Sequence, residues 1–248
     1  KMKISIITVC YNSAATIKDT IESLLKQSYP DVEYLILDGA SSDSTMDIVN
    51  RYKDKIAFIG SEKDKGMYDA LNKGIDRASG EIIGMLNADD FYADEHVIRD
   101  VVNRIQQTNS DALYADLQYV DAVDTTKVKR HWKSGNYKKG DFVKGWMPPH
   151  PTFFIKKACY EKYGSFNLSL TSAADYELML RMIHKYEVSL SYLDRVIVKM
   201  RVGGMSNSSL KNRLRANRED KKAWEINDLK PAPFTFLFKP LRKIRQFI

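Results

Sequence analysis

Acidic and polar side chains follow three strand-like segments of the sequence, at the point where each segment ends. In an open α/β sheet, ligands bind outside the carboxyl ends of the strands, so these side chains are expected to meet in one crevice. Carboxylate oxygens suit Mg²⁺ and Mn²⁺, which are often held by one or two carboxylates together with substrate phosphates. The pattern predicts a crevice that holds an anionic ligand through a divalent cation, lined by Tyr11, Asn12, Asp38, Asn87, Asp89 and Asp90.

The elements that would position these residues alternate between strand and helix. Short apolar runs predict strands at 4–9, 34–37, 57–59 and 82–86, and apolar stripes predict helices after Ser13 and over 46–52, 68–78 and 97–106. After residue 110 we expect further strands, with a hairpin within 117–133, helices near 156–163 and 175–186, and a strand near 188–201. Short connections between alternating elements are typical of an α/β fold with a mostly parallel sheet and helices on both faces.

Several common sites are absent from the sequence. No GxGxxG follows the first predicted strand and no GxxxxGK[ST] is present, which argues against a dinucleotide site and a P-loop. No HExxH or Cys/His cluster indicates zinc, and no GxSxG marks a hydrolase nucleophile. The chemistry therefore has to come from the carboxylates.

Four motifs occur in order over roughly the first 95 residues: SIITVCYN from residue 5, DGASSDST from residue 38, EKDKGMYDALNKG from residue 62, and SGE at 79 leading to NADD at 87. With these motifs the chain resembles family 2 glycosyltransferases of the GT-A fold, in the branch of bacterial O-antigen and capsule transferases. HPT at residue 150, YGSF at 163 and AADYEL at 173 extend the resemblance more thinly.

The resemblance implies a nucleotide-sugar donor, most often a UDP-sugar. We expect residues 1–110 to bind the donor and residues 111–205 to bind the acceptor, as two halves of one GT-A domain. The charge pattern predicts a basic amphipathic extension at 206–248. Asp38 matches the acid that binds uracil, and Asp64 borders the base and ribose. The other residues that match the donor pocket are Thr8, Tyr11, Asn12, Tyr68, Asp69, Asn72, Asn87, Ala88 and Asp90.

The resemblance also implies metal and base catalysis. Asn87-Ala88-Asp89 matches the metal-binding DxD motif, and because its first acid is Asn here, Asp89 would carry the direct contact with Mn²⁺ or Mg²⁺. Asp175 matches the general base of an inverting transfer, which must take a proton from the acceptor hydroxyl. His150, preceded by two prolines, is a candidate ligand of the metal or the diphosphate.

Each of these residues also has an ordinary structural role open to it. Asp89, Asp90 and Asp175 could merely cap helices, and acids in Gly/Ser turns such as Asp38 often only stabilise the turn. A lone histidine such as His150 is often structural. Tyr68 and Asp69 could simply begin a helix.

The net charge of +7 lies in the C-terminal segment. Residues 207–248 hold 11 Lys or Arg against 4 Asp or Glu, so residues 1–206 are neutral. A neutral body argues against a nucleic-acid-binding protein. Basic residues mixed with aromatic and aliphatic ones predict attachment of 207–248 to an anionic membrane surface. The alternative is that this segment packs back on the body.

Composition is that of a globular protein, with 44% hydrophobic residues and no apolar run of 18, so no transmembrane helix is predicted. Two separated cysteines favour a reducing cytosol, and the first residues do not resemble a signal peptide. We therefore expect a cytoplasmic enzyme, peripheral on the inner face of the membrane, that extends a lipid-linked surface glycan. A nucleotidyltransferase and a non-catalytic scaffold of the same fold are the alternatives, and the oligomeric state stays open.

Overall fold

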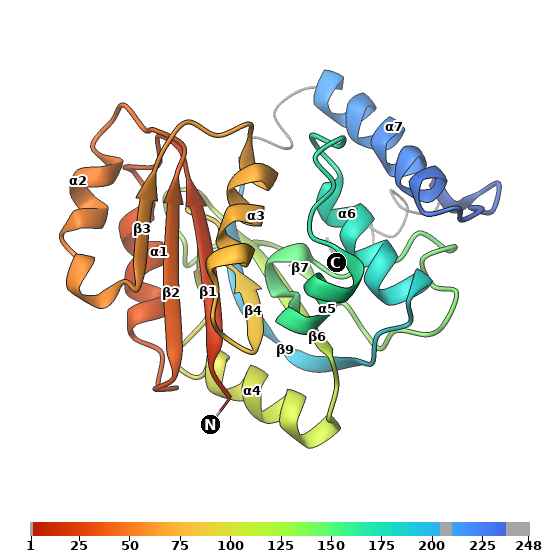
Figure 1. Ribbon diagram of the computed structural model, residues 1–248, viewed down its shortest axis with the longest axis horizontal. Coiled ribbons are helices and arrows are strands. Elements are labelled where there is room, and N and C mark those ends of the chain that lie inside the picture. Colours follow the sequence, from red (N-terminus) through yellow and green to blue (C-terminus); the bar gives the residue numbers. More distant parts are fainter. Residues whose placement is uncertain (1, 204–209, 237–248) are drawn as a thin grey trace.

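The computed structural model describes residues 2–203 and 210–236, without the side chains of residues 210–214. One nine-stranded sheet runs through both halves of the chain in the order β3-β2-β1-β4-β8-β6-β9-β5, with β7 paired to β6 (Figure 1). The strands are β1 Ile4–Cys10, β2 Val32–Asp38, β3 Phe58–Ser61, β4 Ile82–Met85, β5 Asp90–Tyr92, β6 Ala112–Val120, β7 Val128–Trp132, β8 Phe154–Lys156 and β9 Leu190–Arg201.

Helices connect most of these strands. They are α1 Ile17–Leu25, α2 Thr45–Asn50, α3 Met67–Arg77, α4 Val97–Thr108, α5 Lys157–Tyr163, α6 Ala174–Met179 and α7 Leu210–Ile226. Lys53–Lys55 (η1) and His150–Thr152 (η2) are single 3₁₀ turns, and Leu180–Lys185 (η3) continues α6 as a π-helix.

The N-terminal half is the predicted parallel α/β unit. β1 pairs in parallel with β2, with Cys10 opposite Asp38, and with β4, with Ile7 opposite Met85. Parallel pairing in this register brings the carboxyl ends of these three strands to one edge of the sheet. α3 approaches the strands closely because Gly74 has no side chain, since a Cβ there would lie 2.7 Å from Ile7 Cγ2.

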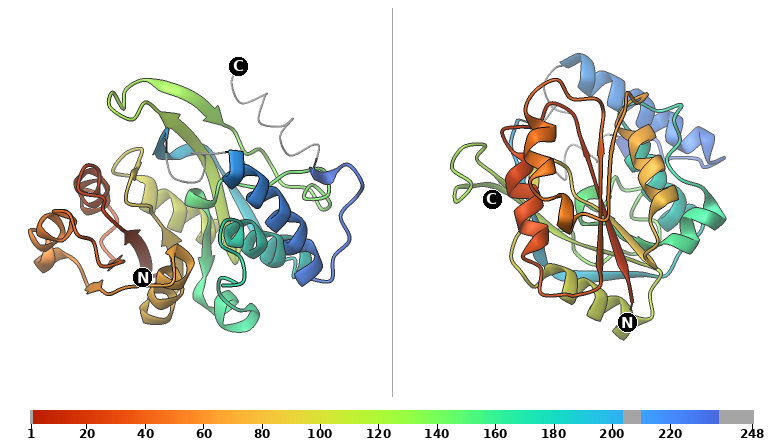
Figure 2. Two further views of the ribbon diagram at one scale, coloured as in Figure 1. Left: turned by 90° about the horizontal axis from the view of Figure 1, so that it is seen from above. Right: turned by 60° about the vertical axis from the view of Figure 1, so that its left-hand side comes forward.

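Helices cover both faces of the sheet, as the alternating pattern predicts (Figure 2). The apolar stripes of α1, α2 and α4 bury side chains such as Ile21, Val49 and Val101 on one face. α3, α5 and α6 bury Leu71, Tyr160 and Leu178 on the other. The α/β fold with helices on both faces is confirmed.

The C-terminal half of the sheet is mixed. Four of the eight strand pairings among the described residues are antiparallel, and three of them involve β6 or β8. β6 and β7 form the hairpin expected within 117–133. β5 and β8 span three residues each, too short for a side-chain period to reveal them in the sequence.

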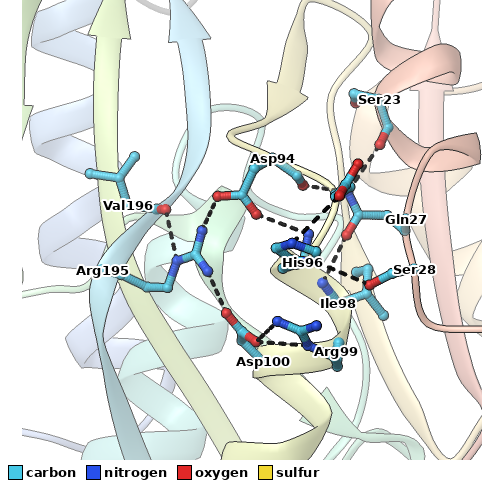
Figure 3. A network of polar contacts seen from close by, with 11 residues as sticks. Ser23, Gln27, Ser28, Asp94, His96, Ile98, Arg99, Asp100, Arg195 and Val196 are labelled. Carbon is cyan, nitrogen blue, oxygen red and sulfur yellow. Dashed lines mark hydrogen bonds and ion pairs between the residues drawn. The ribbon is translucent and has the colours of Figure 1, made fainter.

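A network of polar contacts joins the segment between β5 and α4 to its neighbours (Figure 3). Gln27 Nε2 donates to the carbonyl of Asp94 at 2.7 Å, and its Oε1 accepts from the N–H of Ile98 at 2.9 Å. Arg195 of β9 pairs with both Asp94 and Asp100. These contacts fasten the segment after α1, the segment before α4, α4 itself and β9 to one another.

The last described helix packs on the body. Trp224 of α7 is wholly buried, and its indole N–H donates to the hydroxyl of Tyr176 in α6 at 2.9 Å. Further along, the Thr235 hydroxyl donates to the carbonyl of Val143 at 2.6 Å. Residues 204–209 and 237–248 of the predicted membrane segment lie outside the described residues. Within the described ranges, the helices are too short or too polar to span a bilayer.

Candidate active site

A pocket of about 180 Å³ lies at the carboxyl ends of β2 and β3 against α3. Its apolar wall includes Leu37 and Phe58, and the Arg77 guanidinium lies over the Phe58 ring at 4.4 Å from its centroid. Two of the predicted donor residues, Asp38 and Asp64, line it together. The sheet therefore brings at least these two separate motifs to one place.

The mouth of this pocket is built around Asp64 and Tyr11. A Cβ on Gly39 would lie 2.9 Å from Asp64 Oδ2 and 3.5 Å from the Tyr11 ring, so the three residues adjoin. Asp64 Oδ1 accepts from the N–H of Gly66, at the turn where α3 begins. Tyr11 is 59% exposed. An exposed aromatic ring beside a carboxylate offers a planar base both a stacking surface and a hydrogen-bond acceptor.

Asp38 is held by the protein itself. It is 2% exposed, and its oxygens accept hydrogen bonds from the Ser61 hydroxyl at 2.6 Å and from the backbone N–H of Ser41 at 3.0 Å. The Ser41 hydroxyl and the Cys10 thiol also donate to it. Asp38 thus fixes the loop after β2, and a ligand would have to share its remaining lone pairs.

Asn12 fastens the loop after β1 to the loop after β2. Its backbone is left-handed, with φ 47°. Its side-chain oxygen accepts from the N–H of Ser42 at 2.9 Å, and its own N–H donates to the Ser41 hydroxyl at 2.8 Å. Asn12 therefore shapes the rim of the crevice by joining its two loops.

Two predicted donor residues face the core. Thr8 is wholly buried and its hydroxyl accepts from Tyr34 at 3.1 Å, so its side chain does not form a pocket wall. Asp90 is also wholly buried, in β5. Burial, followed by repulsion from Asp89, raises its pKa well above the usual value. Strand β5 thus turns the Asp90 side chain inward, and the place of Asp90 in the donor pocket stays a prediction.

The NADD motif forms the turn between β4 and β5. The Asn87 amide donates to Asp90 Oδ2 at 2.9 Å, and the Ala88 carbonyl accepts from Thr16 at 2.8 Å. Arg201 of β9 donates to the carbonyl of Asp89 at 2.8 Å. Of the two acids, Asp89 is partly exposed and Asp90 is buried.

Asp89 is suited to a cation. It makes no ion pair with any residue that the structure describes, although Arg201 is near. Burial raises its pKa, against the opposing effect of its own N–H and Arg201. A desolvated carboxylate without a partner is stabilised by a nearby cation. In the described ranges no three His, Cys, Asp or Glu side chains converge as a full ligand set.

A second group of predicted residues meets at α3 and α6. The Tyr68 hydroxyl donates to Asp175 Oδ1 at 3.2 Å, across 107 positions of sequence. Burial and the Asp175 carboxylate raise the pKa of Tyr68, which keeps it a hydrogen-bond donor. Tyr68 also stacks on Phe166, with ring centroids 5.3 Å apart. Asp175, at the start of α6, thus has one oriented hydrogen-bond partner from α3.

His150 joins this second group. Its ring meets Phe166 edge-on at 5.7 Å, and η2, which carries it, contacts both β4 and α6. Burial lowers the pKa of His150, while the Asp175 carboxylate opposes that shift. A neutral imidazole between the strand that leads to Asp89 and the helix that carries Asp175 can accept a hydrogen bond or bind a cation.

The remaining donor residues of α3 have structural contacts. The side-chain amide of Asn72 bonds to both backbone groups of Phe166. Its nitrogen donates to the Phe166 carbonyl at 3.0 Å, and its oxygen accepts from the Phe166 N–H at 2.9 Å. Asp69 accepts from the N–H of Lys65 at 3.1 Å and pairs with Lys73. Asn72 therefore orients the ring of Phe166, which sequence reasoning did not assign to the site.

A buried ion pair supports the loop before Phe166. Arg181 and Glu177 form a two-pronged pair, with Nε to Oε1 at 2.8 Å and Nη2 to Oε2 at 3.1 Å. Glu177 also accepts from the Asn227 amide after α7 at 2.9 Å. The other guanidinium protons of Arg181 donate to the backbone carbonyls of Tyr163, Gly164 and Ser165. One guanidinium thus links α6 to the loop that positions Phe166.

Replacing Arg181 by Lys is expected to lower the free energy of unfolding by about 2–3 kcal/mol, because an ammonium cannot reproduce the planar fork and leaves buried acceptors without donors. Urea unfolding followed by circular dichroism measures the change. Arg99→Lys is the matched control, since Arg99 is exposed and should change stability by no more than about 0.5 kcal/mol. Equal stability of both variants would contradict the role of Arg181.

The fold and site together define an α/β protein with polar and acidic side chains gathered at the carboxyl ends of its parallel strands. The family model described as "Glycosyl transferase family 2" matches residues 5–160, and the chain belongs to that family. The fold is of the GT-A type, as the resemblance implied.

Relatives agree with this family, and solved structures agree with its fold. The chain is 26% identical over 208 residues to "PGL/p-HBAD biosynthesis glycosyltransferase" of Mycobacterium bovis, covering 82% of this chain and 79% of the relative. S. aureus TarS 1-349, solved in complex with UDP-GlcNAc, superposes with a TM-score of 0.71 at 20% identity. The match covers 91% of this chain and 65% of that one, so the chain spans less than two thirds of the TarS structure. PcManGT from Pyrobaculum calidifontis, in complex with GDP-Man and Mn²⁺, matches with a TM-score of 0.68 at 19% identity, over 96% of this chain and 68% of that one.

Proposed function

We propose that this glycosyltransferase is an inverting, divalent-metal-dependent enzyme that transfers a hexosyl or N-acetylhexosaminyl group from a UDP-sugar to a surface glycan. The observation that carries the proposal is the pair formed by Tyr68 and Asp175 across 107 positions of sequence. It supports the proposal because it ties the carboxylate of α6 to α3, the helix that also lines the pocket shared by Asp38 and Asp64. S. aureus TarS, whose structure holds UDP-GlcNAc, supports a donor of this class.

The donor would lie along the carboxyl edge of the sheet. Its base fits the pocket shared by Asp38 and Asp64, with the exposed ring of Tyr11 at the mouth. Its diphosphate would lie toward Asp89, one strand beyond β1. Asp89, with His150 as a second candidate, would hold Mn²⁺ or Mg²⁺, which supplies charge stabilisation at the leaving diphosphate.

The transfer is a single displacement at the anomeric carbon. Asp175 accepts the proton of the acceptor hydroxyl as its oxygen bonds to that carbon, and the bond from the carbon to the diphosphate breaks on the opposite side. The electron pair leaves with the diphosphate, so the product has inverted configuration. The hydrogen bond from Tyr68 holds one oxygen of Asp175 in place and leaves the other for the acceptor.

The acceptor is proposed to be a lipid-linked glycan at the inner face of the membrane, in the manner of O-antigen or capsule synthesis. The support is the basic segment 207–248, rich in lysine, arginine and phenylalanine. In the described part of that segment, Phe234 is 58% exposed. Trp224, by contrast, is buried on the body. Any contact with an anionic membrane would therefore come from residues outside the buried face of α7.

A donor screen tests the proposal. The protein is incubated with UDP-, GDP- and dTDP-sugars and Mn²⁺, nucleotide release is measured, and the configuration of the product is read by proton NMR. Release from a UDP-sugar with inversion at the anomeric carbon is expected. A retained configuration would overturn the single-displacement mechanism, and absence of binding to every nucleotide sugar by calorimetry would overturn the function.

A further inference from the structure

Three consecutive backbone amides before α6 are gathered around one side chain of α7. The N–H groups of Thr171, Ser172 and Ala173 donate to the carboxylate of Glu219 at 3.0, 2.7 and 3.0 Å. The Thr171 hydroxyl adds a fourth hydrogen bond at 2.8 Å. Glu219 lies 46 positions or more from these residues in sequence, so the contact depends on how α7 packs.

The loop that Glu219 binds is the one that delivers Asp175. Ala173 is the residue at the N-terminal boundary of α6 and, as an alanine, has no side chain that could cap the helix. Without an acceptor from another part of the chain, these N–H groups would hydrogen-bond only to water. The loop would then have no hydrogen bond from these amides to hold it against the protein. A carboxylate surrounded by successive N–H groups is a favourable arrangement, and it fixes the backbone two residues before Asp175.

The packing of α7 supports this contact at both ends. Arg215, four residues before Glu219, donates to the Ser172 hydroxyl at 2.9 Å. After it, Trp224 binds Tyr176 and Asn227 binds Glu177. Glu219 also lies near enough to Tyr68 to contribute to the raised pKa of that hydroxyl. The helix is therefore fastened to the segment on both sides of Asp175.

We infer that Glu219 is a positioning residue for Asp175, and that α7 contributes to the acceptor side of this enzyme by holding the segment that carries Asp175. The inference rests on the proposed function, because it takes Asp175 to be the base. Glu219 does not touch the reacting atoms. It fixes the 171–173 loop, and the loop holds the Asp175 carboxylate at the position from which it can accept the proton of the acceptor hydroxyl.

The test compares Glu219→Gln and Glu219→Ala with wild type in the 248-residue chain. Gln keeps one acceptor oxygen and Ala keeps none, so kcat should fall by about 3- to 10-fold in Gln and about 10- to 100-fold in Ala, since small misplacements of a reacting group have effects of this size. Donor affinity by calorimetry should stay within about twofold of wild type in both variants, because the proposed donor pocket is formed by β2, β3 and α3. Glu225→Gln and Glu225→Ala on the exposed face of the same helix should leave kcat unchanged.

Hydrogen exchange keeps the inference separable from the proposed function. Amides 171–173 should exchange faster in Glu219→Ala than in wild type, and this holds whether or not the enzyme transfers a sugar. If the wild type is active and Glu219→Ala has the same kcat, the positioning role is overturned. Unchanged exchange at 171–173 would overturn the contact itself. An inactive wild type with faster exchange in the variant would overturn the proposed function, and with it the assignment of Glu219 to catalysis.

Discussion

Replacement of Asp175 by Asn is expected to lower the rate of sugar transfer by about 10²- to 10⁴-fold, the range that general-base catalysis contributes. Asn has nearly the same shape and can still accept a hydrogen bond from Tyr68, which now lies 3.2 Å from Asp175 Oδ1. It cannot take a proton from the acceptor hydroxyl. Single-turnover transfer assays under saturating donor measure the change, and donor affinity by calorimetry should be unaltered.

Asp76→Asn is the control for this result. It makes the same chemical change at an exposed position of α3, the helix that carries Tyr68, and transfer should proceed at the wild-type rate. A variant of Asp175 that transfers sugar normally would remove this residue from the role of base. A variant that loses donor binding as well would instead place Asp175 on the donor side.

The strands and helices of the N-terminal half could be predicted from the sequence, because the local apolar patterns there match the way these elements pack in the fold. β1, β2 and β4 are buried on both faces, so their apolar runs mark them clearly, and helices of opposite faces alternate with them. The positions of Asp38 and Asp64 in one pocket follow from the parallel pairing of β2 with β3. The order of the motifs along these strands is therefore enough to predict that Asp38 and Asp64 lie together, without any information from the C-terminal half.

Adjacent polar residues could not be sorted by the same reasoning. Asp89 and Asp90 differ only in which one faces solvent, and that is decided by the pairing of Asp90 with Met200 of β9, 110 residues away. The resemblance placed Thr8 in the donor pocket, whereas in the structure the Thr8 side chain is buried and accepts a hydrogen bond from Tyr34 of the neighbouring strand. Single-sequence patterns carry no information about such partners.

Residues that act through backbone contacts were also beyond the sequence. Asn72 matched a donor motif, but its amide is used on the backbone of Phe166. Glu219 lies in a basic segment whose charge suggested a membrane surface, and its contact with the 171–173 loop depends on the docking of α7. The pairing of distant segments decides both roles, and no local pattern records it.

Replacement of Asp89 by Ala is expected to abolish metal-dependent donor binding and to lower transfer by about 10³-fold or more, because a metal ion at a leaving phosphate supplies several kcal/mol of charge stabilisation. Asp89 is the partly exposed carboxylate of the NADD turn and has no ion-pair partner among the described residues. Calorimetry of UDP-sugar binding with and without Mn²⁺ measures the effect. Wild type should bind more tightly with Mn²⁺, and the variant should bind equally weakly in both conditions.

The pH dependence of the Mn²⁺ effect tests the same carboxylate without a mutation. Burial raises the pKa of Asp89 above its usual value, and protons compete with the cation for it. The gain in donor affinity from Mn²⁺ should therefore be full near neutral pH and decline as the pH falls toward that raised pKa, at a higher pH than an exposed aspartate would give. Asp54→Ala, at an exposed site, should keep the whole Mn²⁺ effect. An Asp89→Ala protein that retains it would show that the cation is held elsewhere, and His150→Ala would then be the variant expected to lose it.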